Sequence, residues 1–518
     1  MDGKNTTPFL IGVATSGYQS EGGYNGPGEP KNNWGACEIS GRVQTTGDAV
    51  DFWNRYRDDF RLARGVGLNA FRLGIEWARV QPSASTNRGP APEFDNAAID
   101  AYALRIAACR EEGLEPVVTL QHFTHPAWLG LDAWLNNDTP GLFEIFVKHT
   151  VARINDRLAD VHGQPPIRWY VTINEPNMLV LNTYLNRHFP GGPDAGIPIG
   201  LRAYNRLLVA HLRAYNAIHD LHDSRGWERP LVSMNTFCSD VYWSDMMLLD
   251  LLSLRTVGVK PSEAGEYFAA RAHDLSEHFT AAALRRRTDL AAMAGAGLHR
   301  LANYFAARAA TEEGCGYFFR EQERATRDDA MDYLGVDYYD PFLSHALRLP
   351  EFSDLEFKSR SLSAHLFDVL SSKWWDWHFL PEGMSAFCSF YATAFPGLGI
   401  LIAENGMSQR CSQDNSSSGP RRDGLTRSDY LEAHLLEVRR MLDGGIPLLG
   451  YLHWSLTDNY EWGSFTPRFG LFRIDFPSGL ERLAVDHLGD NPSQTYARLV
   501  RRHGFDALTV SITPARFS

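Results

Sequence analysis

Residues 167–177 read Ile-Arg-Trp-Tyr-Val-Thr-Ile-Asn-Glu-Pro-Asn, and the interpretation of the whole fold starts from this stretch. Its β-branched and aromatic residues predict a buried strand, and Pro176 cannot extend the hydrogen-bonded ladder, so Glu175 stands at the carboxyl end of the strand. A second stretch, 399–406, has the same form, a short apolar strand that ends in Glu404. In parallel α/β folds the carboxyl ends of the strands carry the chemistry. Two acidic residues at two strand ends therefore predict a functional pair.

Strands and helices alternate along the rest of the chain. Six further apolar stretches predict strands, and the segments between them carry apolar residues at the spacing of amphipathic helices. These stretches are residues 9–14, 70–73, 116–120, 231–235, 333–336 and 448–454. Eight strands that are separated by helices predict a (β/α)8 TIM barrel with extended loops after its strands.

No linker, repeat or change of composition divides the 518 residues. We therefore predict one barrel domain over residues 1–518. The Ala-, Arg- and Leu-rich stretch around 240–327 is longer than one crossover needs, which predicts a helical insertion there. Thr426 or Ser428 is expected to cap the helix that follows the strand with Glu404.

Composition and charge argue against several classes of protein. The formal net charge of −12 argues against a nucleic-acid partner. No run of roughly 18 apolar residues is present, which argues against stable membrane insertion. The six cysteines lie far apart and no signal peptide is visible, so we predict a cytoplasmic protein with free thiols. The sequence leaves the oligomeric state open.

The residues expected at the mouth of the barrel are rich in amides, carboxylates, imidazole and indole side chains. Amides, imidazole and carboxylates can hydrogen-bond several hydroxyl groups at once, and indole rings pack on the apolar face of a pyranose. Arg72, inside a predicted strand, is costly to bury unless it pairs with an acid. The composition predicts a sugar site in which two carboxylates act as acid and nucleophile at a glycosidic bond. The residues at the mouth are Gln19, Arg72, His122, Asn174, Glu175, Tyr339, Glu404, Trp454, Glu461 and Trp462.

Residues 172–177, Thr-Ile-Asn-Glu-Pro-Asn, and 402–406, Ile-Ala-Glu-Asn-Gly, resemble the two glutamate motifs of glycoside hydrolase family 1. These are β-glucosidase-like barrel enzymes that act with retention, and the resemblance covers nearly the full chain. It implies that Glu175 is the acid/base residue, that Glu404 is the nucleophile, and that no cofactor takes part. It further implies a sugar site formed by Gln19, His122, Asn174, Trp454, Glu461 and Trp462, with Arg72 and Tyr339 in contact with Glu404.

Departures from the family pattern modify this expectation. Phe123 stands where the family usually has tryptophan, which removes one indole donor near the 3-hydroxyl of the sugar. Ala403 replaces a usual threonine, and Gly74 replaces a small hydroxyl residue and is expected to affect only packing.

Asp337 replaces a usual asparagine and puts a third carboxylate beside the pair. If it were ionised it would disfavour the charge on Glu404, so we expect Asp337 to be protonated or balanced by a cation. Phe469 is a further candidate for the site, and Trp374 is a candidate for stacking on a second sugar or an aryl group at the entrance. His122 and His125 are three residues apart, but no third ligand has a suitable spacing, so we predict no metal site.

The leading interpretation is a retaining β-glycosidase that acts on terminal non-reducing β-D-glycosyl residues of a small-molecule substrate. It requires the carboxyl groups of Glu175 and Glu404 to face each other about 5 Å apart. Glu461 is expected to bind the 4- and 6-hydroxyls and to disfavour 6-phosphorylated sugars. A transglycosidase that uses an alcohol or lipid acceptor is an alternative. A non-catalytic sugar-binding relative is a third, and the presence of both glutamates argues against it.

Overall fold

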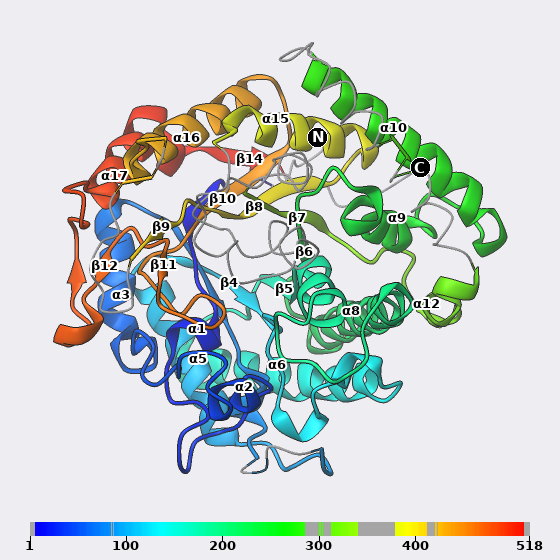
Figure 1. Ribbon diagram of the computed structural model, residues 1–518, viewed down its shortest axis with the longest axis horizontal. Helices are drawn as coiled ribbons and strands as arrows, with labels where there is room; N and C mark the ends of the chain where they lie inside the picture. Colours follow the sequence, from blue (N-terminus) through cyan, green and yellow to red (C-terminus); the bar gives the residue numbers. More distant parts are fainter. Residues whose placement is uncertain are drawn as a thin grey trace, which may run out of the picture.

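The computed structural model describes residues 6–83, 85, 88–284, 300–301, 303, 312–339, 379–411, 420–421 and 423–511. Trp374 and most of the loop between Arg410 and Arg427 lie outside these residues. The structure contains a closed barrel of eight parallel strands (Figure 1). In order around the barrel, the strands are β10 (Leu448–Trp454), β2 (Leu10–Ala14), β3 (Ala70–Gly74), β4 (Glu115–Thr119), β5 (Trp169–Asn174), β6 (Leu231–Phe237), β7 (Tyr333–Tyr338) and β8 (Gly399–Asn405). The predicted (β/α)8 fold is confirmed.

Amphipathic helices surround the barrel (Figure 1). On α3, for example, Phe52 and Phe60 pack against the ring of Phe71 on β3, with ring centroids 5.9 and 4.9 Å from it. Burying one such side chain stabilises the fold by roughly 1.5–3 kcal/mol. The surrounding helices are α3 (Phe52–Val66), α5 (Asn96–Glu111), α6 (Thr139–His162), α8 (Ile197–Arg225), α15 (Pro381–Ala394), α16 (Arg427–Asp443) and α17 (Pro492–His503).

Thr426 caps α16, in agreement with one of the two candidates from the sequence. Its hydroxyl accepts a hydrogen bond from the backbone N–H of Asp429, whose side chain in turn accepts from the backbone N–H of Thr426. This capping box satisfies backbone donors that the first turn of a helix leaves free.

The connection from β6 to β7 contains the helices α9 (Met246–Ser253), α10 (Ala264–Leu284) and α12 (Glu312–Arg324). They fall within residues 240–327, the stretch for which we predict a helical insertion. Shorter elements carry the loops: α1 (Gly17–Ser20), α2 (Gly35–Ile39), α4 (Trp77–Val80), α7 (Pro176–Val180), and the pairs β1 (Thr6–Pro8) with β14 (Thr509–Ser511), β9 (Gln409–Arg410) with β11 (Pro467–Arg468), and β12 (Arg473–Ile474) with β13 (Arg482–Leu483).

One strand boundary differs from the sequence prediction in a way that matters for the site. The sixth strand was expected to end at Val336, but β7 continues to Tyr338 and places Asp337 inside the barrel wall, in register with Glu404 on β8. An aspartate usually ends a strand because its charge needs water. Here its side chain is fully buried and accepts a hydrogen bond from Asn235 on β6, so the strand continues through it.

Among the described helices, none combines the length and the apolarity that crossing a bilayer requires. All six cysteines are buried and free.

Candidate active site

The carboxyl ends of the barrel strands meet at a pocket of about 490 Å³. Most of the residues predicted at the mouth line this pocket. Those that do not, namely Gln19, Arg72 and Asn174, contact residues that do. Asp337 lies beside Glu175 and Glu404. The lining residues are His122, Phe123, Glu175, Met178, Asn182, Phe189, Phe237, Tyr339, Glu404, Trp454, Glu461, Trp462 and Phe469.

Glu175 is held in a strained backbone conformation. It follows β5 directly and precedes Pro176, which begins α7, and its φ of 39° lies in the left-handed region. Phe123 and Trp462, two other lining residues, also have positive φ angles, 68° and 44°. For residues other than glycine such conformations cost roughly 1–3 kcal/mol each and are enriched at functional sites. The Glu175 side chain lines the pocket.

Glu404 is held by two donors. Arg72 on β3 donates from Nη1 to Glu404 Oε1 over 2.7 Å, and the Tyr339 hydroxyl donates to Oε2 over 2.9 Å. The remaining donors of Arg72 bond to Thr119 Oγ1 and to the side chain of Asn174. The arginine is completely buried, and this set of acceptors offsets the cost of removing its charge from water. The pairing of Arg72 with one of the carboxylates, predicted from that cost, is confirmed.

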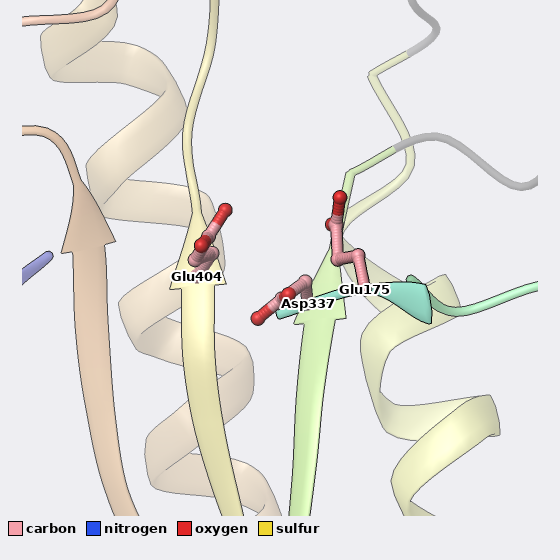
Figure 2. Close-up of side chains that lie close together, drawn as sticks. All are labelled: Glu175, Asp337 and Glu404. Carbon is pink, nitrogen blue, oxygen red and sulfur yellow. The ribbon is translucent and has the colours of Figure 1, made fainter. Parts of the chain in front are cut away.

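Figure 2 shows Glu175, Asp337 and Glu404 grouped at the ends of their strands. One carboxylate oxygen from each of the three lies within 4.8 Å of the other two. The two glutamates therefore approach each other closely enough for one oxygen of each to lie within 4.8 Å. Carboxyl groups about 5 Å apart fit attack by one of them on a sugar, whereas pairs that activate a water between them stand roughly 6.5–9.5 Å apart.

The surroundings separate the protonation behaviour of the glutamates. Burial, followed by the nearby charge of Glu404, raises the pKa of Glu175 well above its ordinary value. Burial also raises the pKa of Glu404, but Arg72 and the Tyr339 hydroxyl oppose that rise. Proton loss is consequently easier for Glu404 than for Glu175. The two environments suit a nucleophile that is ionised and an acid that keeps its proton.

A second polar cluster forms one end of the pocket. Glu461 accepts hydrogen bonds from Trp454 Nε1 at 2.8 Å and from Gln19 Nε2 at 3.0 Å, and burial raises its pKa to about 8. Gln19 reaches this position because α1 packs closely on β3. A Cβ atom at Gly74 would lie 2.8 Å from the backbone nitrogen of Gly17, so this contact needs glycine.

His122 is a neutral hydrogen-bonding group. Its imidazole lies parallel to the indoles of Trp454 and Trp462, with centroids 5.5 and 5.8 Å away, and burial together with Arg72 holds its pKa well below the usual range. His125 bonds instead to the carbonyl oxygen of Gly130.

Several contributors to the site escaped the sequence interpretation. Asn235, at the end of β6, donates to Asn174 and to Asp337. It carries the same signal as the predicted residues, a polar side chain near the end of an apolar strand. Met178, Asn182, Phe189 and Phe237 also line the pocket, and the apolar ones among them look like core residues in the sequence. Phe469 lines the pocket as expected.

Comparison with known proteins shows which family the chain resembles. Residues 3–234 and 273–502 match the model of glycosyl hydrolase family 1. A beta-galactosidase from Sulfolobus acidocaldarius is 25% identical over 90% of each chain. Beta-glucosidase 42 from Arabidopsis thaliana is 26% identical over 92% of this chain and 90% of its own. A 6-phospho-beta-galactosidase from Streptococcus equi subsp. zooepidemicus is 24% identical over 90% of this chain and 93% of its own.

The fold also resembles that of a solved beta-glucosidase from Thermotoga maritima in complex with azafagomine. The TM-score is 0.66 with 22% identity, and the match covers 96% of this chain and 98% of the other.

Proposed function

The chain belongs to glycosyl hydrolase family 1, a family of retaining β-glycosidases, and on this premise we propose that it hydrolyses terminal, unphosphorylated β-D-glycosides with apolar aglycones. Glu404 is the nucleophile and Glu175 the acid/base residue. The observation that carries this assignment is that one carboxylate oxygen of Glu175 and one of Glu404 lie within 4.8 Å of each other at the pocket. Glu404, and not Glu175, forms an ion pair with Arg72.

In the first step a carboxylate oxygen of Glu404 bonds to the anomeric carbon while the bond from that carbon to the aglycone oxygen breaks. Glu175 gives its proton to the departing oxygen, so the aglycone leaves as a neutral alcohol. Arg72 and Tyr339 orient Glu404 for the attack, since each holds one of its oxygens. The sugar is then bound to Glu404 as an ester.

In the second step Glu175, now a carboxylate, removes a proton from a water molecule whose oxygen attacks the anomeric carbon. The ester bond breaks, Glu404 regains its charge and Glu175 regains its proton. Two inversions leave the sugar with its original configuration. The ordering of the two pKa values, with Glu175 shifted further upward, supports this division of roles.

The polar end of the pocket favours a free sugar over a phosphorylated one. Glu461 accepts one hydrogen bond on each of its carboxyl oxygens, and each oxygen can accept a further one from a sugar hydroxyl. Phosphate groups are typically bound by arginine or lysine. Among the described residues that line the pocket, none is a lysine or an arginine. Although relatives of both kinds exist, these features point to unphosphorylated glycosides.

The remaining wall of the pocket is apolar. Met178, Phe189, Phe237 and Phe469 contribute to it, and Phe237 stacks on Tyr339 with ring centroids 5.7 Å apart. An aryl or alkyl aglycone would bury apolar area against these side chains, at ~25 cal/mol for each Å² removed from water. A second sugar unit would gain less from this wall.

A panel of substrates tests the proposal. We expect kcat/KM for p-nitrophenyl β-glucoside or β-galactoside to exceed that for the matching 6-phosphate by ~100-fold or more, because the phosphate would meet Glu461 and no cation. We also expect kcat/KM for aryl and octyl glycosides to exceed kcat/KM for cellobiose. A preference for the 6-phosphates would refute the assignment of the free sugar. Product analysis with added octanol distinguishes hydrolysis from the alternative of glycosyl transfer.

Absence of any nitrophenol release, including a first-turnover burst, would favour a non-catalytic sugar-binding role. The cytoplasmic location also stays a prediction, supported by six free thiols that fit a reducing compartment.

A further inference from the structure

We propose that Asp337 is a third functional carboxyl group of the site and that it shares a proton with Glu175. The pair retains this proton at a higher pH than Glu175 alone would. The inference rests on the proposed role of Glu175 as the acid. Asp337 is a positioning residue in this scheme, because it acts on the substrate only through Glu175.

The described residues around Asp337 leave one of its oxygens without a hydrogen-bond donor. The residue lies inside β7 with its side chain fully buried, and its Oδ2 atom accepts a hydrogen bond from Asn235 Nδ2. Its Oδ1 atom receives no hydrogen bond from a described amide, guanidinium or hydroxyl group, and the same holds for Oε1 of Glu175. Two buried carboxyl groups that lie close together, each with one oxygen that receives no hydrogen bond, are stabilised by a proton between them.

The charges facing Asp337 lead to the same conclusion. Glu175 faces it from the end of β5, Glu404 from β8 and Arg72 from β3. The other titratable neighbours, Tyr333 and Tyr339 of its own segment and Cys238 after β6, are neutral at physiological pH because burial raises their pKa values.

Arg72 is thus the one cation that faces Asp337 among the described residues, and its short contact is with Glu404. Three carboxylates against one guanidinium would leave a net charge of −2 in a buried site. One proton shared by Asp337 and Glu175 reduces that charge to −1, and a second proton on the pair would bring it to zero. Burial, then Glu404, raises the pKa of Asp337 well above its ordinary value, as it does for Glu175.

A shared proton changes how the acid responds to pH. When the fully protonated pair loses its first proton, the second is distributed over both residues, so part of the protein still carries a proton on Glu175. Loss of that second proton creates two adjacent charges beside Glu404 and therefore requires higher pH. An asparagine at position 337 has no acidic proton to share with Glu175. Its amide would donate a hydrogen bond to the Glu175 carboxylate and so favour the ionised form of Glu175. Removal of the Asp337 carboxyl should therefore make the protein lose its acid at lower pH.

Asp337→Asn tests this directly through the pH dependence of kcat/KM, which reports the free enzyme. We expect the ratio of kcat/KM at pH 9 to that at pH 6 to fall ~10-fold or more relative to the unsubstituted protein, the equivalent of one pKa unit. The basic limb should also change from two steps to one. Asp245→Asn is the matched control, because Asp245 is another buried carboxyl near the end of β6 but bonds to Thr236 and Tyr391 outside the pocket.

An infrared measurement on the protein without substrate separates this inference from the proposed function. The difference spectrum between the unsubstituted protein and Asp337→Asn at pH 7 cancels the bands of other buried acids such as Glu461, and it should contain the carbonyl band of a protonated carboxyl group. In Glu175→Gln the band should persist but titrate at lower pH, because the remaining acid has lost its partner. This pattern would support the shared proton even if no glycoside is hydrolysed.

The proposal is overturned if Asp337→Asn leaves both the band and the basic limb unchanged, or if Asp245→Asn shifts the limb equally. It is also overturned if the band appears only after a chelator has removed a bound metal ion, since a cation would then balance the three carboxylates.

Discussion

Glu404→Gly is expected to lower kcat for aryl β-glycosides by a factor of ~10⁴–10⁶, the scale of loss when a catalytic nucleophile is removed. The substitution leaves a space beside Arg72 and Tyr339, which bond to the missing carboxylate in the intact protein. Azide can enter this space and attack the anomeric carbon in place of Glu404. We therefore expect added azide to restore turnover of a substrate with a good leaving group and to give the α-glycosyl azide, with inverted configuration.

Glu404→Gln is the matched control. Its side chain has nearly the size of the original and fills the space, so we expect an inactive protein that azide does not rescue. Rescue of the glycine variant with retained configuration, or an active Glu404→Gln variant, would remove Glu404 from the nucleophile role. Thermal unfolding of both variants, compared with the unsubstituted protein, separates loss of chemistry from loss of fold.

Glu175→Ala is expected to have the second largest effect, and the size of that effect should depend on the leaving group. For an alkyl glycoside, whose oxygen must be protonated as it departs, we expect kcat/KM to fall ~10²–10⁴-fold, the range of general acid catalysis. For a dinitrophenyl glycoside, which leaves without a proton, kcat/KM should change less than ~10-fold. Steady-state measurements across a series of phenols check this dependence.

The second step provides an independent check on Glu175. With dinitrophenyl glycosides the sugar ester should accumulate, because water lacks its base, and azide should speed turnover with a product of retained configuration. Glu175→Gln is the size-matched control. An equal loss for all leaving groups would contradict the assignment of Glu175 as the acid.

The barrel was predictable because its signals are local. Each strand is a short apolar stretch, and each of the two glutamate strands stops at a polar residue before a proline or a glycine. The pairing of Arg72 was also predictable, since a guanidinium inside a strand requires an acid. The sequence did not show that this acid is Glu404 without the family resemblance, because the partner lies more than three hundred residues away in the chain.

The rest of the site depends on contacts that no local pattern reveals. Phe189 and Phe237 have the composition of core residues, and only the closed barrel brings them to the pocket. The apolar pattern predicts a strand that ends at Val336, before Asp337, but β7 continues through Asp337. The donor from Asn235 and the neighbouring carboxyl groups change that expectation. The departure from the local rule is consistent with the role that we propose for Asp337.

The most direct test of the account is covalent trapping with 2,4-dinitrophenyl 2-deoxy-2-fluoro-β-glucoside, followed by mass spectrometry of the digested protein. Fluorine slows both steps, while the good leaving group lets the first proceed, so the sugar ester accumulates. We predict one 2-fluoroglucosyl group on the peptide that contains Glu404, with loss of activity in proportion to labelling. A label on Glu175 or Asp337, or continued turnover with no labelled peptide, would contradict the account.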